Sequence, residues 1–262
     1  MSGSRGYRVE RMGRARLALA AGQELAVKRH LMYALVEADL TVPRRLLREH
    51  REQTGERLSL TAYVVTCLAQ SLAEYPLLNA FRRGRSVVFL DEVIVEVLVE
   101  RSIGGQPAVG YLPIRNANTK SLRDIHDEIR ASQASTAETI AGQRWLELVP
   151  AFVTPVLMRW MRRSIHWALQ LGVAGVNNIG MGTDTGGWGV SPGAGTLAVT
   201  IGGIKPRPHL LDGRLVEREI AHLTMTFDHD VIDGAPAARF TSRLLELLAA
   251  GDPIQAALGA KP

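Results

Sequence analysis

The sequence has a single cysteine among its 262 residues, and this excludes an intramolecular disulfide framework. That cysteine, Cys67, lies in the apolar stretch 58–72, which favours a small core residue over a nucleophile. No apolar run approaches the roughly 18 residues of a membrane-spanning helix, and no apolar core follows the basic N-terminal residues. These absences predict a protein of a reducing, cytoplasmic compartment with no membrane partner.

Aromatic residues are scarce at 5%, although the formal net charge is +5. A basic chain with few aromatics and no recognised nucleic-acid motif does not predict nucleic-acid binding, and the charge would equally suit a ligand with phosphates. Apolar residues make up 46% of the chain and predict a packed core. Because no repeat or linker divides the sequence, we predict a loose N-terminus at 1–8 and a single domain at 9–262.

Hydrophobic periodicity and turn residues predict a mixed α/β domain. Helices are expected at 11–21, ended by a glycine, and at 44–54, 60–74, 121–135, within 145–171 and at 235–248. Ser59 is expected to cap the helix at 60–74. Strands are expected at 30–41, 86–90, 93–100, 108–114, 196–201 and up to residue 229, with the pair 86–90 and 93–100 adjacent and a hairpin around Asp212 and Gly213. The glycine-rich segment 180–187 lacks both phosphate-binding glycine patterns, so we interpret it as a hairpin loop.

The segment 224–234 is the most informative part of the sequence. An alternating strand pattern runs into His229, which is flanked by acids, and an Asp-Gly pair at Asp233 precedes the last helical pattern. A histidine there can act as a base while an aspartate four residues later fixes the local geometry. The same Asp-Gly pair also suits a plain turn.

A metal site is not predicted here. The potential ligands alternate between the two faces of a strand, so few of them can converge on one ion. These ligands are His222, Asp228, His229, Asp230 and Asp233.

Residues 227–235 resemble the D-H-R-x-x-D-G-A motif of the 2-oxo acid dehydrogenase acyltransferase catalytic domain, which shares its fold with chloramphenicol acetyltransferase. Four further segments resemble that family's motifs in the family's order, at 37–41, 60–80, 112–122 and 177–180. The matched segments together span roughly residues 30 to 245. The resemblance implies a two-layer α/β (α+β) domain, a chloramphenicol acetyltransferase-like mixed sheet with helices packed on it.

The resemblance also implies roles for individual residues. His229 would be the general base that deprotonates an attacking thiol. Asp233 would be structural and would pair with an arginine near the N-terminus, for which Arg14 is the best match and Arg11 and Arg16 are rivals.

Two positions depart from the family pattern. Asn177 stands where the family has serine or threonine, so its amide could replace the hydroxyl that donates to the oxyanion, or it could cap the glycine-rich turn. Asp230 stands where the family usually has arginine, and an unscreened acid there would raise the pKa of the neighbouring histidine.

The resemblance further implies a homotrimer, or a larger assembly of trimers, with the base of one subunit facing Asn177 of the next. Acyl-CoA would be a substrate, and no metal is implied. Because we expect no lipoyl domain in this chain, the acceptor would be a dihydrolipoyl group on a carrier protein in trans or a small thiol. Two alternatives stay open: a catalytically impaired trimeric scaffold, and a stand-alone acetyltransferase for a small amine or hydroxyl acceptor.

Overall fold

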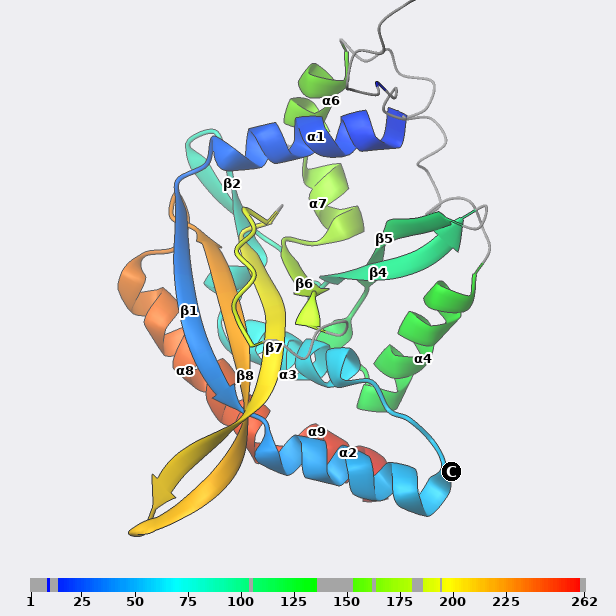
Figure 1. The fold of residues 1–262 in the computed structure, drawn as a ribbon. Helices are drawn as coiled ribbons and strands as arrows, with labels where there is room; N and C mark the ends of the chain where they lie inside the picture. The colour runs from blue at the N-terminus through cyan, green and yellow to red at the C-terminus, as the bar shows by residue number, and fades with distance from the viewer. Residues whose placement is uncertain are drawn as a thin grey trace, which may run out of the picture.

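The computed structural model describes residues 9, 14–103, 106–135, 153–161, 164–180, 186–193 and 195–259. Six strands form one mixed sheet in the order β1-β8-β7-β6-β4-β5 (Figure 1). They are β1 (Leu31–Asp39), β4 (Val95–Ile103), β5 (Gln106–Ile114), β6 (Ala174–Asn178), β7 (Leu197–Leu211) and β8 (Arg214–Asp228). Strand β6 runs parallel to β4 and β7, and the other neighbours are antiparallel.

Helices cover one face of this sheet and one of its ends (Figure 1). The covering layer contains α2 (Thr41–Thr54), α3 (Leu60–Glu74), α4 (Leu122–Ala134), α8 (Gly234–Ala250) and α9 (Asp252–Gly259). At the upper end in Figure 1 lie α1 (Arg14–Val27), α6 (Thr154–Met161) and α7 (Ile165–Leu171). Short 3-10 turns span Pro76–Asn79 and Ala117–Thr119. This arrangement confirms the predicted two-layer fold with a mixed sheet.

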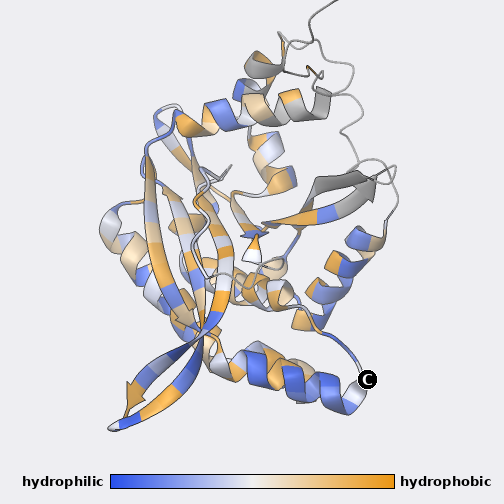
Figure 2. Ribbon diagram, in the orientation of Figure 1, coloured by the Kyte–Doolittle hydropathy of each residue, from blue (hydrophilic) through white to orange (hydrophobic). Residues whose placement is uncertain are grey.

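The hydrophobic core lies between the sheet and α3 and α8. Helix α3 begins where Ser59 accepts a hydrogen bond from the Ala62 N–H, as its sequence predicts. Phe227 of β8 is fully buried and meets Phe240 of α8 edge to face, with ring centroids 6.5 Å apart. Each such buried aromatic contributes about 2–3 kcal/mol through removal of apolar area from water. By contrast, the surface helix α2 is largely hydrophilic in Figure 2.

The opposite face of the sheet is partly covered by an extended segment, residues 186–193. The indole Nε1 of Trp188 donates to the Val36 carbonyl at 3.2 Å, and Thr226 Oγ1 donates to the Ser191 carbonyl at 3.0 Å. The Gly187 N–H donates to Nδ1 of the buried His222 at 3.0 Å. These hydrogen bonds hold the segment against β1 and β8. Residues 181–185 of the glycine-rich region lie outside the described residues.

Two sequence predictions about the elements are wrong, and a third element was not predicted. Helix α1 does not end at Gly22 but continues to Val27, since one glycine inside a helix costs only about 1 kcal/mol. Strand β3 (Ser86–Phe89) pairs with β2 (Ala80–Arg83) and not with β4, because Asn79 Nδ2 bonds the carbonyls of Leu90 and Glu92 and so holds the chain in a bend. Strand β6 was not among the strands that periodicity predicted.

Two other predictions are confirmed. The hairpin turn at Asp212 and Gly213 has both residues in the left-handed region, with φ of 48° and 75°. Cys67 is fully buried in α3, where burial raises the pKa of its thiol to about 12, so it is a core residue. Within the described residues, no helix combines the length and the apolar character that crossing a membrane requires.

Candidate active site

His229 lies directly after β8, where the chain leaves the sheet towards α8. Its backbone N–H donates to the carbonyl of His30 at 2.7 Å, which fixes this residue to the start of β1. The ring is half exposed, and its Nδ1 lies 3.7 Å from Oδ1 of Asp233, too far for a hydrogen bond. Asp233 occupies the N-cap of α8 with an exposed carboxylate. The structure thus brings the two predicted residues together on an open surface.

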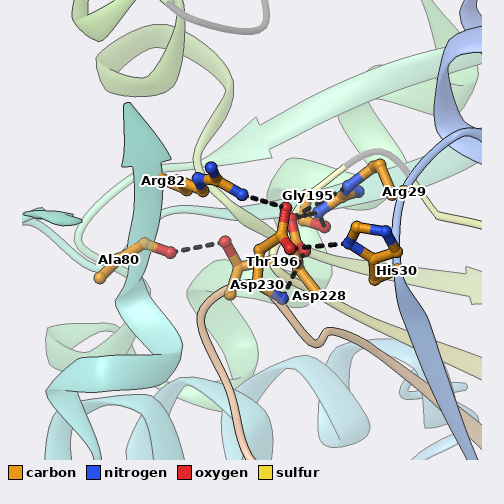
Figure 3. A network of polar contacts seen from close by, with 8 residues as sticks. All are labelled: Arg29, His30, Ala80, Arg82, Gly195, Thr196, Asp228 and Asp230. Atoms are coloured by element: carbon orange, nitrogen blue, oxygen red, sulfur yellow. Dashed lines mark hydrogen bonds and ion pairs between the residues drawn. The ribbon is translucent and has the colours of Figure 1, made fainter. Parts of the chain in front are cut away.

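A buried ion pair holds the turn that presents His229 (Figure 3). Nε of Arg29 donates to Oδ2 of Asp228 at 3.0 Å, and its Nη2 donates to the carbonyl of Gly195 at 2.6 Å. The side chains of the pair are only 7% and 11% exposed. Arg29, which the sequence did not single out, therefore ties the end of β8 to the residues before β1 and before β7.

Replacing Arg29 by methionine should lower the free energy of unfolding by about 3 kcal/mol, because Asp228 would keep a buried charge without its counter-ion. Urea unfolding followed by circular dichroism measures the change. Arg45→Met is the matched control, since its pair with Glu49 is exposed and is expected to contribute less than about 1 kcal/mol. Equal stability of the two variants would show that the buried pair does not hold this turn.

Asp230, next to His229, is screened by two basic side chains (Figure 3). One carboxylate oxygen lies 2.8 Å from Nδ1 of His30, and the other accepts from Nη1 of Arg82 at 2.8 Å. These hydrogen bonds, that from His30 first, lower the pKa of Asp230. The acid is therefore not unscreened, and it links the residues next to β1 and β8 to β2.

Asn177 and Asn178 end strand β6 and have different surroundings. Asn178 points to the helical layer, where its Nδ2 donates to Thr61 Oγ1 at 2.9 Å and its Oδ1 accepts from the Gly180 N–H at 3.1 Å. Asn177 points to the opposite face and makes no side-chain hydrogen bond within the described part of the chain. Asn178 is thus the residue that orders the turn, which favours the donor interpretation of Asn177.

Gly180 is required at this turn. A Cβ there would lie 1.9 Å from the carbonyl oxygen of Gly202 on β7, a distance that no side chain tolerates. The Asn-x-Gly pattern therefore has a local structural cause, and it leaves the residue before it, Asn177, free for another role.

Asn177 and His229 do not meet within one chain. Asn177 lies opposite Thr200 on β7, which lies opposite Thr224 on β8, five residues before the histidine. With about 3.3 Å per residue and about 4.8 Å between strands, the two side chains are roughly 15–20 Å apart. Reacting groups must approach to about 3–3.5 Å. One chain therefore cannot place both residues on the same substrate carbonyl.

Part of the chain matches a known protein family. The family profile of the 2-oxoacid dehydrogenases acyltransferase (catalytic domain) matches residues 169–258, a range that contains Asn177, His229 and Asp233. The matched range is about a third of the chain, and in this range the chain is similar to the 2-oxoacid dehydrogenase acyltransferase catalytic domains. The dihydrolipoyllysine-residue acetyltransferase component of the pyruvate dehydrogenase complex of Bacillus subtilis (strain 168) is 26% identical over 223 residues. That match covers 83% of this chain and 44% of the relative, so the chain spans less than half of the relative's length.

Solved structures of the acyltransferases have the same fold. A dihydrolipoamide acetyltransferase of Azotobacter vinelandii has a TM-score of 0.72 at 20% identity, with 95% of this chain and 94% of that chain covered. Chloramphenicol acetyltransferase has a TM-score of 0.50 at 13% identity, with 92% and 98% covered. The chloramphenicol acetyltransferase-like fold that the sequence implied is therefore confirmed.

Some predicted features of the candidate site stay predictions. The side chains of Arg14, Arg11 and Arg16 lie outside the described residues, so the structure does not show the partner of Asp233. In the part of the chain that the structure describes, no three His, Cys, Asp or Glu side chains gather as a metal site would require.

Glu96 of β4 carries a carboxyl on the same face of the sheet as Asn177. It lies beside Gly175 of β6 in the parallel register, and desolvation raises the pKa of its carboxyl from 4.5 to about 7. The alternation of β4 placed this residue on the polar side of a half-buried strand, where a glutamate carries no signal of function. Sequence reasoning therefore missed it.

Replacing Glu96 by glutamine should make stability less dependent on pH. The fold favours the protonated carboxyl, so its contribution is complete below about pH 4.5 and is lost as the pH rises to about 7. Above pH 7 the Glu96→Gln protein should be more stable than the wild type by up to about 3 kcal/mol. Urea unfolding at pH 5 and pH 8 tests this, with the exposed Glu100→Gln as control. Parallel pH profiles for wild type and Glu96→Gln would contradict it.

Proposed function

We propose that this chain is an acyltransferase that moves an acyl group between coenzyme A and a thiol acceptor, with His229 as general base. The observation that carries the proposal is the position of His229, fixed through its backbone at the end of β8 with its ring open to solvent. A neutral imidazole with free access is what deprotonation of an incoming thiol requires.

The proposed reaction has one tetrahedral intermediate. His229 takes the proton of the acceptor thiol as its sulfur attacks the thioester carbonyl, and a new carbon–sulfur bond forms. The carbonyl oxygen becomes an oxyanion, to which the amide of Asn177 donates a hydrogen bond. The bond to the coenzyme A sulfur then breaks, and the leaving thiolate takes the proton from the imidazolium of His229.

The spacing of the three residues supports these roles. The Azotobacter vinelandii structure belongs to an investigation of the role of a serine, a histidine and an asparagine in the catalytic mechanism. The serine and histidine of that enzyme are as far apart in sequence as Asn177 and His229, and its asparagine follows the histidine at the spacing of Asp233. This agreement supports Asn177 at the serine position and Asp233 as the partner that orders the turn.

A homotrimer would complete the site. Because Asn177 lies roughly 15–20 Å from His229 of its own chain, a neighbouring subunit must bring its Asn177 to the histidine. Cyclic symmetry then gives three equivalent sites, and such trimers could assemble further. The excess of basic residues suits the phosphates of acyl-CoA. A reducing cytoplasm would keep the acceptor thiol, free or on a lipoyl carrier protein, available for attack.

An acceptor panel tests the proposal. The purified protein is incubated with several acyl-CoA thioesters and free dihydrolipoamide, a lipoylated carrier protein, or a small thiol, amine or alcohol, and the acylated product is measured by mass spectrometry. We expect thioester consumption with at least one thiol. Turnover only with lipoyl acceptors would indicate a component of a dehydrogenase complex, and turnover only with amines or alcohols a stand-alone acetyltransferase. No turnover with any pair would contradict the enzyme and favour a trimeric scaffold.

A further inference from the structure

The carboxyl of Glu96 lies next to the proposed oxyanion site. Glu96 and Gly175 are register partners on the parallel strands β4 and β6, and a Cβ on Gly175 would lie 3.9 Å from Oε2 of Glu96. The glutamate side chain therefore leans across β6. Asn177 follows Gly175 by two residues and points to the same face, about 6–7 Å farther along the strand. The glycine leaves the space between the two side chains without an obstructing Cβ.

Glu96 has no cationic partner among the residues that the structure describes. No ion pair or hydrogen bond of its carboxylate is present there, although desolvation raises the pKa of the group to about 7. The charge of Glu96 acts on Tyr111 of β5, whose own pKa is raised first by desolvation and then by that charge. An unpaired carboxylate in a desolvated position is unfavourable, and a cation bound beside it would relieve that cost.

We propose that Glu96 binds an ammonium group of the acceptor, so that the site prefers a short aminothiol over a neutral thiol. The inference rests on the proposed acyltransferase function, because it places the attacking sulfur against the thioester carbonyl at Asn177. A two-carbon aminothiol together with a charge-assisted hydrogen bond of about 2.8 Å spans a distance close to the separation of Asn177 and Glu96. No covalent bond of Glu96 forms or breaks in the reaction, and the residue determines specificity for the acceptor.

Two small thiols test this preference. Cysteamine carries an ammonium group where 2-mercaptoethanol carries a hydroxyl. Each thiol is assayed with acetyl-CoA and with the wild-type, Glu96→Gln and Glu100→Gln proteins. Glu100 is the matched control because it lies on the same face of β4, two positions beyond Leu98, and is exposed. Comparing the ratio of kcat/KM values between variants cancels the difference in intrinsic reactivity of the two thiols.

Glu96→Gln should lose about ten- to hundredfold in kcat/KM for cysteamine and less than threefold for 2-mercaptoethanol, as expected for loss of a hydrogen bond to a charged group. Glu100→Gln should keep the wild-type ratio. An unchanged ratio in Glu96→Gln would overturn the inference and leave the acyltransferase function intact. An equal loss of kcat/KM for both thiols, together with a smaller assembly in light scattering, would also overturn the inference. That result would indicate that Glu96 pairs with a neighbouring subunit. If the wild type turned over neither these thiols nor any other acceptor, the proposed function itself would fail.

Discussion

Replacing His229 by alanine should lower kcat by about 10²- to 10⁴-fold, the usual contribution of a general base. The thiol would then have to lose its proton to water, and the leaving coenzyme A thiolate would lack its proton donor. Stability should change little because the ring is half exposed and makes no hydrogen bond to any residue that the structure describes. Turnover of acetyl-CoA with dihydrolipoamide, at saturating concentrations of both, measures the effect.

His209→Ala is the control for this variant. His209 is exposed on the hairpin of β7 and β8 that projects from the body of the domain in Figure 1, away from the end of the sheet that carries His229. Its replacement should leave kcat unchanged. A His229→Ala protein that kept kcat within threefold of the wild type would remove the histidine from the mechanism.

Replacing Asn177 by alanine should lower kcat by about 10²- to 10³-fold, because the oxyanion would lose a positioned hydrogen-bond donor. Asn177→Ser should retain much more activity than Asn177→Ala, since a hydroxyl can donate to the same oxygen. The KM for acetyl-CoA should change less than kcat, as the interaction forms mainly in the transition state. Steady-state kinetics of the three proteins measure both parameters.

Asn178→Ala separates the donor role from a structural one. Asn178 makes the hydrogen bonds to Thr61 and Gly180, so its loss should lower the free energy of unfolding by about 1–3 kcal/mol. Asn177→Ala should leave that free energy nearly unchanged. If Asn177→Ala lowered stability while kcat stayed at the wild-type value, the cap interpretation of Asn177 would be correct and the donor role wrong.

Local sequence signals account for much of the fold. Ser59 before an apolar helix and the Asp-Gly pair at Asp212 each specify a structure within a few residues, and both were predicted correctly. Strand β6 was not, because its five residues include a glycine and two asparagines and so lack the alternation of a half-buried strand. The pairing of β3 was missed because it depends on the side chain of Asn79, which donates hydrogen bonds to the carbonyls of Leu90 and Glu92 after the strand.

The site was predictable where its residues are close in sequence. His229 and Asp233 are four residues apart, and the structure brings them together. Arg29 and Asp228 are 199 positions apart, so their pairing follows from the alignment of β1 with β8 and not from a motif. The screening of Asp230 by Arg82 is likewise a product of the tertiary fold.

The central claim is that His229 of one subunit and Asn177 of its neighbour form one site, and mixing two inactive variants tests it most directly. Purified His229→Ala and Asn177→Ala proteins are dissociated together in equal amounts, reassociated, and assayed for acyl transfer against each variant treated alone. If subunits mix at random, about a quarter of the interfaces carry both wild-type residues, so about a quarter of wild-type activity should return. Activity no higher than the mean of the two variants, in mixed assemblies verified by native mass spectrometry, would contradict a shared site.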